Sequence, residues 1–177
     1  MADTLSDNIK SGVFERLGSG ADAHQGVMDM LVNIPMFSEF DSREIQLLAE
    51  YLYAYRAKKG AVLFKEGDRG QYMCLLIDGK AGIYKDNAKG GNKQVAIVRR
   101  GKTMGEMAII DGLPYSATAV TEEPSVIIII TNKNFEQITT QQPRLGVKLL
   151  IQISRFISQR LRQTTGVLVD FLESSSG

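Results

Sequence analysis

The chain has little of the chemistry on which enzyme and metal sites depend: one histidine (His24), one cysteine (Cys74) and no tryptophan among 177 residues. A catalytic metal site needs several imidazole, thiolate or carboxylate ligands close together, and a serine or cysteine nucleophile needs a neighbouring base. His24 lies ahead of the strand-rich part of the chain, so it completes neither arrangement there. We therefore predict that the protein is not an enzyme and holds no metal or other cofactor.

The chain also lacks an excess of charge and a long apolar run. A formal net charge of +1 at pH 7 gives no broad basic field for nucleic acid or an anionic membrane. The longest aliphatic run, residues 126–130, is too short to span a bilayer, and the N-terminal residues have no apolar signal-peptide region. The lone Cys74 excludes an internal disulfide, and its apolar neighbours predict a small core residue. Together these features predict a cytoplasmic protein without a membrane partner.

Hydrophobic residues make up 44% of the chain, and their spacing divides it into three segments. Residues 1–33 are polar with helical spacing, residues 34–141 turn to short strand patterns, and residues 142–177 are helical again. The middle segment opens with a helix that Asp41 or Ser42 can cap. After it, glycines separate short β-rich runs, which is typical of a sandwich or barrel. The expected strands are residues 61–64, 71–77, 81–85, 93–98, 116–121 and 126–130.

The last segment predicts a short helix over residues 134–139 and then a long helix over about residues 144–172, started by Pro143. Apolar residues recur on one face of the long helix at a spacing of three or four, interrupted by Arg160. Packing on the helix's own domain explains part of this face. The face also continues well past a small barrel, which predicts the seam of a homodimer. The predicted seam residues are Leu150, Ile153, Ile157 and Val167.

Residues 101–120 hold the most informative stretch of the sequence. They predict a short helix between two strands, and Thr103 and Glu106 stand at capping-box spacing, so Glu106 can serve as a local cap. A helix that starts beside Gly105 also presents free N–H groups, which form a general anion site. The residues alone leave both interpretations open.

The same stretch resembles the phosphate-binding cassette of the cyclic-nucleotide-binding superfamily, which includes catabolite-activator-type regulators and protein kinase A regulatory subunits. The family pattern is Gly-Glu-apolar-Ala-apolar, a short spacer, then Pro-Arg-small-Ala-Thr, and residues 105–118 match its spacing without insertion. The resemblance covers about residues 34–161. It implies a mainly β fold, an antiparallel double-stranded β-helix (a jelly-roll-like β-roll) over residues 34–141, with flanking N-terminal helices and a long C-terminal helix. Earlier landmarks are Pro35-Met36-Phe37, Glu66-Gly67-Asp68 and Ile77-Asp78-Gly79.

The resemblance also implies a ligand, cyclic AMP or cyclic GMP, and a role for each cassette residue. Gly105 would let the cyclic phosphate approach the backbone, Glu106 would accept a hydrogen bond from the ribose 2′-OH, and Ser116 would donate to a phosphate oxygen. Backbone N–H groups at the helix start would face the phosphate, and Ala117 would lie behind the pocket. The implied ligand-binding residues are Gly105, Glu106, Met107, Ala108, Tyr115, Ser116 and Ala117.

One cassette position departs from the family pattern: Tyr115 stands where the family has arginine. An arginine fork pairs bidentately with a phosphate, whereas tyrosine offers one neutral O–H. The loss amounts to ~1.5–3 kcal/mol, or roughly ten- to a hundredfold in affinity. Three readings stay open: weak cyclic-nucleotide binding, a different ligand, or an empty structural pocket. Arg99 or Arg100 can substitute in part, although strand alternation lets only one of them point inward.

We therefore predict a small-molecule-sensing regulatory module of signalling type. Ligand at the cassette would shift a hinge near residues 132–143 and transmit binding to the C-terminal helix. The alternative is a ligand-independent dimerisation or protein-interaction domain with a degenerate nucleotide pocket, favoured by Tyr115 and the long apolar helix face. The sequence does not identify a protein partner. No helix-turn-helix follows the long helix, so no direct DNA binding is expected.

Overall fold

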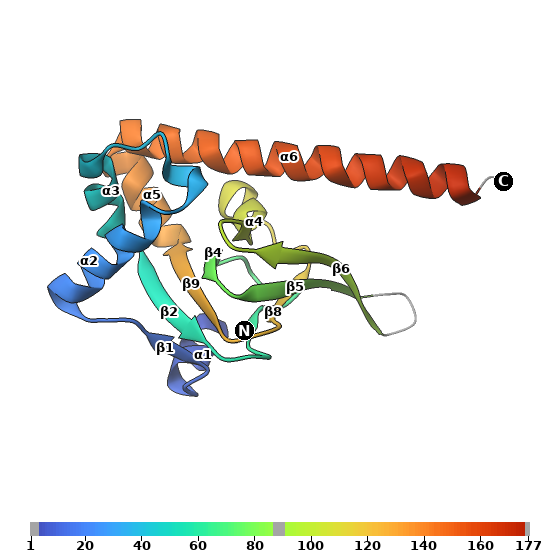
Figure 1. Ribbon diagram of the computed structural model, residues 1–177, viewed down its shortest axis with the longest axis horizontal. Helices are drawn as coiled ribbons and strands as arrows, with labels where there is room; N and C mark the ends of the chain where they lie inside the picture. The colour runs from blue at the N-terminus through green and yellow to red at the C-terminus, as the bar shows by residue number, and fades with distance from the viewer. Residues whose placement is uncertain (1–3, 87–90, 176–177) are drawn as a thin grey trace.

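The computed structural model describes residues 4–86 and 91–175, and Figure 1 shows two β-sheets beside a layer of helices. Every strand pair in both sheets is antiparallel, which confirms the expected antiparallel roll. One sheet has the order β1-β2-β9-β4-β7 and the other the order β3-β8-β5-β6. The strands are β1 (Phe14–Arg16), β2 (Tyr53–Ala57), β3 (Val62–Phe64), β4 (Tyr72–Asp78), β5 (Lys80–Asp86), β6 (Asn92–Arg99), β7 (Thr103–Met104), β8 (Thr118–Thr121) and β9 (Ser125–Thr131).

The helices surround one side and one end of the roll (Figure 1). The predicted cap at the start of α3 is confirmed: the Glu44 backbone N–H donates to Asp41 Oδ1 at 2.9 Å, and the Asp41 N–H donates to Glu44 Oε2 at 2.9 Å. Among the described residues, no helix is both long and apolar enough to cross a bilayer. The helices are α1 (Thr4–Lys10), α2 (Gly20–Leu31), η1 (Pro35–Phe37), α3 (Ser42–Ala49), α4 (Glu106–Asp111), α5 (Asn132–Gln141) and α6 (Pro143–Ser175).

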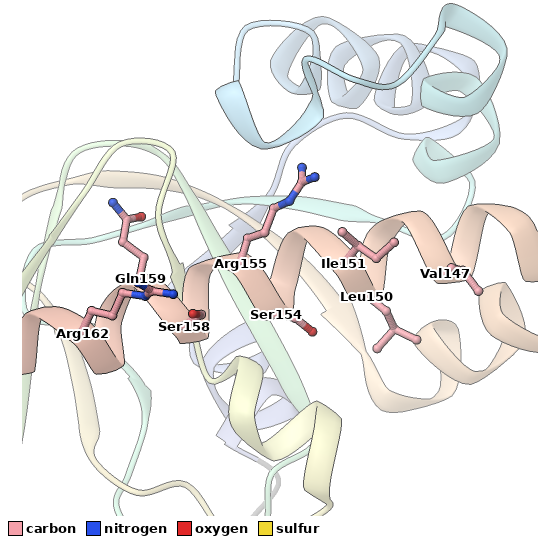
Figure 2. Close-up of a pocket in the computed structure, with 8 residues that line it drawn as sticks. All are labelled: Val147, Leu150, Ile151, Ser154, Arg155, Ser158, Gln159 and Arg162. Carbon is pink, nitrogen blue, oxygen red and sulfur yellow. The ribbon is translucent and has the colours of Figure 1, made fainter.

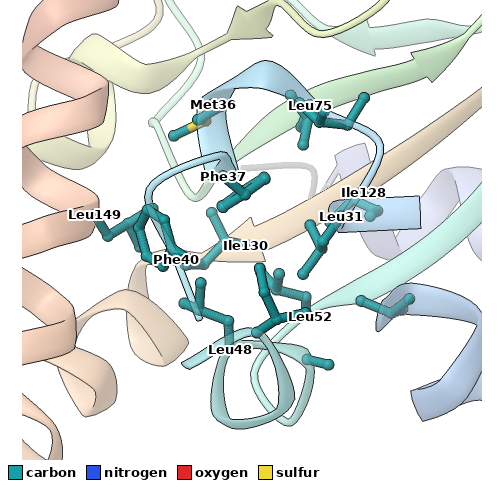
Figure 3. Packing of buried hydrophobic residues seen from close by; sticks show 14 of the residues in the cluster. Leu31, Met36, Phe37, Phe40, Leu48, Leu52, Leu75, Ile128, Ile130 and Leu149 are labelled. Carbon is teal, nitrogen blue, oxygen red and sulfur yellow. The ribbon is translucent and has the colours of Figure 1, made fainter. Parts of the chain in front are cut away.

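Strand β9 divides the hydrophobic core into two clusters because its side chains alternate between two buried faces. Ile127 and Ile129 point into the roll, and Ile128 and Ile130 point toward the helices. Figure 3 shows the second cluster, where Ile128 and Ile130 meet side chains from η1, α3 and α6. The predicted β-branched strand at residues 126–130 is therefore correct, and the roll and its helical layer are packed onto a common strand.

The N-terminal segment, expected to be helical over residues 1–33, also contains a strand. Strand β1 pairs with β2 in antiparallel register, Phe14 opposite Ala57, and Phe14 is buried in the roll's cluster. A strand of three residues is too short to show a period of its own. Its place at the edge of the sheet comes from pairing with β2, which the local sequence pattern does not reveal.

Helix α6 packs on the domain only along its first half. Leu149 and Ile153 are buried in the helical cluster, whereas residues 158–174 are all exposed, and Figure 1 shows the helix continuing past the roll. The predicted dimer seam is therefore wrong at Ile153, which is 0% exposed inside its own domain. Leu150 and Ile157 are half-buried, and Val167 is exposed. Ten residues past Ile157, Val167 is rotated by about 80° around the helix, so the four residues do not share one face.

Candidate functional site

The candidate site begins at Gly105, between β7 and α4. Its backbone is left-handed (φ 77°, ψ 8°), a conformation that side-chain-bearing residues rarely adopt. The space beside it is also full, because a Cβ at this position would lie 3.0 Å from Tyr115 Cε1 and 3.1 Å from the Tyr72 carbonyl oxygen. Glycine is thus required here for two reasons. In this structure, the groups that approach its backbone are the chain's own aromatic residues.

Tyr115 fills the place beside Gly105 and is itself 5% exposed. Its ring stacks on Phe64 with a centroid distance of 4.1 Å and an interplanar angle of 15°. Its hydroxyl donates to the Tyr72 carbonyl at 2.7 Å and accepts from the N–H groups of Tyr72 at 3.1 Å and Gln71 at 3.2 Å. Burial raises the pKa of this phenol. Since a hydroxyl has one proton and two lone pairs, none of its hydrogen-bonding capacity remains for a phosphate in this conformation.

Glu106, the first residue of α4, is 1% exposed and forms an ion pair with Arg160 of α6 through its Oε1 atom. A second guanidinium nitrogen, Nη2 of Arg160, donates to the Thr103 carbonyl at 2.9 Å. Glu106 Oε2 and Thr103 Oγ1 are buried without a hydrogen-bond partner among the described residues. The local capping box between Thr103 and Glu106 is therefore wrong, since the N-cap is Gly105 and Thr103 belongs to β7.

Arg160 is the site residue that the sequence did not identify. In the sequence it only interrupts the apolar face of the long helix. The sequence does show a cation within the apolar face of this helix. It does not show which residue the cation contacts, because that depends on where the axis of α6 passes over α4. Figure 1 shows α4 directly beside α6. The Arg160 side chain is 46% exposed, so the ion pair joins an exposed arginine to a fully buried carboxylate.

The other cassette residues differ in their exposure. Ala108 is buried and packs so closely on Gly70 that a Cβ on Gly70 would overlap the Ala108 methyl group, whereas Met107 and Ser116 are exposed. The Ser116 carbonyl accepts from Lys85 Nζ at 2.6 Å. Ala117 is half-buried.

Lys85 is a second cation near the cassette that the sequence did not identify. It pairs with Glu66 as well as with the Ser116 carbonyl. The Lys85 hydrogen bond holds the pKa of the Glu66 carboxyl below its usual range. The arginines named from the sequence, Arg99 and Arg100, are exposed at the end of β6, and Arg99 stands opposite Lys80 in the sheet register.

Little else in the described residues has the chemistry of a site. Residues 4–86 and 91–175 contain no group of three or more His, Cys, Asp and Glu side chains placed to hold a metal ion. Cys74 is a buried core residue, as predicted, and burial raises the pKa of its thiol. The cassette, with its buried carboxylate at the start of α4, is the arrangement most suited to recognising a small polar molecule.

Comparison with known proteins agrees with this geometry. Residues 55–142 match the family model of the cyclic nucleotide-binding domain. The chain is 25% identical over 129 residues to the Cyclic AMP receptor protein of Thermus thermophilus, an alignment covering 73% of this chain and 58% of that protein. It is 22% identical over 136 residues to the cAMP-dependent protein kinase regulatory subunit of Mycosarcoma maydis, covering 77% of this chain and 25% of that one. The chain therefore spans less than two thirds of these relatives' own length.

Solved structures give the same result at the level of the fold. A cyclic nucleotide-binding domain from Methylobacillus flagellatus superposes with a TM-score of 0.81 at 26% identity, covering 96% of both chains. The regulatory subunit of a cAMP-independent protein kinase A from Trypanosoma brucei superposes with a TM-score of 0.65 at 20% identity, covering 81% of this chain and 51% of that one. The second match, at its lower identity, concerns the fold alone.

Proposed function

The chain belongs to the cyclic nucleotide-binding domain superfamily, and on that premise we propose that it is a regulatory module whose cassette recognises a ribose-bearing small molecule and passes the event to α6. The observation that carries this proposal is Glu106, a buried carboxylate at the start of α4 with one oxygen left without a partner. A buried acceptor of this kind is costly unless a donor satisfies it. The 2′-OH of a ribose is such a donor.

The proposed contact set is the cassette, residues 105–108 and 115–117, with cyclic AMP or cyclic GMP as the reference ligand. Tyr115 limits the affinity, because a phosphate beside Gly105 would have to displace a phenol that makes hydrogen bonds to Tyr72 and Gln71. Each such bond is worth ~0.5–1.5 kcal/mol net, and no arginine fork offsets the phosphate charge there. We therefore expect weak binding of both cyclic nucleotides.

Transmission to α6 is supported by a chain of contacts. Ala108 of α4 packs on Gly70, and the Gly70 carbonyl accepts from Asn132 Nδ2, at the start of α5, at 2.8 Å. Helices α5 and α6 pack closely at Gly146, where a Cβ would lie 2.8 Å from Thr139 Cα. A displacement of α4 thus reaches the region of residues 132–143 through packed groups, and α5 and the start of α6 would move together.

A second copy of this chain is the partner proposed for α6. Exposed apolar residues fall on one line along the helix at the intervals of four and three typical of a coiled-coil seam, with serine or threonine at the positions between them. Residues 158–174 are exposed, and in proteins most of the stability of a helix comes from packing. Figure 2 shows the groove on the first part of this face, with Val147, Ile151, Ser154 and Ser158 along α6. The revised seam is Val147, Ile151, Ser154, Ser158, Leu161, Thr165, Leu168 and Leu172.

The alternative function is a ligand-independent dimerisation or interaction domain. Two contacts inside the cassette favour it. Tyr115 fills the space beside Gly105, and Arg160 already satisfies one oxygen of Glu106. The fold is compatible with this role, since one of its structural relatives is described as the regulatory subunit of a cAMP-independent kinase.

Isothermal titration calorimetry of the protein and of Glu106→Gln distinguishes the two functions. We expect cyclic AMP or cyclic GMP to bind weakly, and Glu106→Gln to bind more weakly still, because an amide accepts less strongly from a hydroxyl than a carboxylate does. Adenosine, which has the ribose and base without the phosphate, serves as the uncharged control. No heat of binding with any of these molecules, at protein and ligand concentrations in the millimolar range, would favour the ligand-independent alternative.

A further inference from the structure

We propose that the outer edge of strand β6 (Asn92–Arg99) is a docking site for an extended segment of a partner protein, one with an apolar centre and acidic residues at both ends. The edge includes no cassette residue, so the inference goes beyond the proposed function and does not depend on it. The mode of binding is strand addition, in which backbone hydrogen bonds extend the sheet β3-β8-β5-β6 by one strand.

Strand β6 is the last strand of its sheet. It pairs with β5 on one side, and Figure 1 shows it beside β5 at the border of the roll. The backbone N–H and C=O groups on the free side of an edge strand are a template for another strand, and proteins usually protect such edges. One protection is present here: the register between β5 and β6 skips Val95, which is the extra residue of a β-bulge. Residues 96–99 are therefore the regular part of the edge.

Two large apolar side chains are exposed on this strand, Val95 at 55% and Ile97 at 47%, and no other strand that the structure describes carries one. Ile97 stands opposite Gly82 of β5, so no side chain covers it from across the ladder. Val98, the next residue, is buried inside the roll, and alternation along the strand therefore turns Ile97 to the outer face. The edge offers an apolar side chain next to backbone groups with which a new strand can pair.

The two ends of the edge carry positive charge. Lys93 precedes the apolar residues, Arg99 and Arg100 follow them, and residues 91–105 contain no aspartate or glutamate. All three cations are exposed. In the part of the chain that the structure describes, none of them forms an ion pair with a carboxylate. The charge of this edge is thus available to a partner of opposite sign.

The neighbouring strand shows how a cation of this sheet is satisfied. Lys80 of β5 faces Arg99 in the register, and its Nζ lies 2.7 Å from Glu122 Oε2. Glu122 directly follows β8, the strand on the other side of β5. On its free side β6 lacks such a neighbour. A strand added there, with a carboxylate at each end, would pair with Arg99 and Lys93 in the way that Glu122 pairs with Lys80.

A second copy of this chain is the wrong occupant for the edge. In antiparallel pairing of β6 with itself about Ala96, Lys93 of each copy would face Arg99 of the other, and like charges directly opposite each other are destabilising. No other register brings a carboxylate to these cations, because the strand has no acidic residue. The fitting partner is a different protein segment, with aspartate or glutamate on both sides of β-branched residues.

An end-blocked synthetic peptide, Glu-Asp-Val-Thr-Val-Glu-Asp, tests the edge in the full chain. We expect saturable amide chemical-shift changes at residues 95–99 of the ¹⁵N-labelled protein, with the peptide in the millimolar range. A second peptide with proline in place of threonine keeps the charge but lacks a central N–H for the ladder, and it should bind at least about fivefold more weakly. Equal binding of the two peptides, shifts confined to other surfaces, or no shift at all would overturn strand addition.

Charge reversal then tests the selectivity of the edge. The double variant Lys93→Glu, Arg99→Glu should bind the acidic peptide at least about fivefold more weakly, and should instead bind the basic peptide Lys-Lys-Val-Thr-Val-Lys-Lys. Lys58→Glu, Lys59→Glu, which reverses two exposed lysines outside β6, is the matched control with the same net charge and should keep the preference for the acidic peptide. Amide spectra that are unchanged outside the substituted segments show that both variants are folded. A β6 variant that still prefers the acidic peptide would overturn the charge argument.

Discussion

Replacing Tyr115 by arginine should exchange stability for ligand affinity. In the ligand-free protein the substitution removes the hydroxyl bonds to Tyr72 and Gln71 and the stack on Phe64 at 4.1 Å. Hydrogen bonds at ~0.5–1.5 kcal/mol each and an aromatic pair at ~0.5–1.5 kcal/mol give a loss of about 2–6 kcal/mol. Because native domains have ~5–15 kcal/mol of stability, this loss is a large fraction of the total and should be measurable. At about 2–4 °C per kcal/mol for this length, its Tm should fall by roughly 4–24 °C.

The ligand should partly reverse that loss. A guanidinium beside Gly105 supplies the positive partner that a bound phosphate lacks in the unmodified protein. This pairing is worth ~1.5–3 kcal/mol, or a tenfold or larger gain in affinity. Cyclic AMP at a hundred times its Kd should then raise the stability of the variant by ~2.7 kcal/mol. Thermal unfolding followed by circular dichroism, with and without cyclic AMP, measures both effects.

Tyr84→Arg is the matched control for this experiment, since Tyr84 is half-buried and its hydroxyl makes only a 3.4 Å contact with Glu122. It adds the same charge outside the cassette and should not change ligand affinity. An unaltered Tm in Tyr115→Arg would refute the role given to the Tyr115 hydroxyl. A destabilised variant that still ignores cyclic AMP would show that Tyr115 is not what limits binding.

Two further substitutions test the backbone and the helix seam. Gly105→Ala should destabilise the protein by ~1–2 kcal/mol in urea titrations because Gly105 has a positive φ and close neighbours. The control Gly166→Ala, in open space on α6, should be neutral or stabilising by up to ~1 kcal/mol. Equal effects of the two substitutions would refute the strain argument. Leu168→Glu should shift the proposed dimer to monomer in light scattering, because each seam leucine that is fully buried contributes ~1.5–3 kcal/mol. Gln163→Glu, on another face of α6, should leave the dimer intact. An unmodified protein that is monomeric at high concentration would contradict the seam.

The roll could be predicted from sequence because its signals are local. Glycines mark its corners, and the isoleucine run of β9 is too short for a membrane span and too continuous for a one-sided strand. Strands β1, β2 and β7 were not predicted: β1 and β7 have three and two residues, and β2, Tyr53–Ala57, alternates poorly. Pairing along the whole sheet defines these strands, and no short window of sequence contains that pairing.

The candidate site, like the fold, could be predicted only where its residues are close in sequence. Gly105, Glu106 and Tyr115 could be placed together because they belong to one continuous stretch, and Gly105 and Tyr115 are indeed in contact range. Arg160 could not, because its contact with Glu106 depends on the path of α6 across α4. The error at Ile153 has the same origin: an apolar stripe shows that a helix face is covered, but not whether its own domain or a second copy covers it.

The central claim is that the cassette at residues 105–108 is a ligand-responsive site whose affinity is limited by Tyr115. The most direct measurement is a titration of the ¹⁵N-labelled, unmodified protein with cyclic AMP, followed by amide chemical shifts, as the residue-level counterpart of calorimetry. The account predicts saturable shifts at Gly105, Glu106, Met107 and Ala108, accompanied by shifts in residues 158–174 of α6. Shifts confined to other surfaces, or none at millimolar nucleotide, would contradict it.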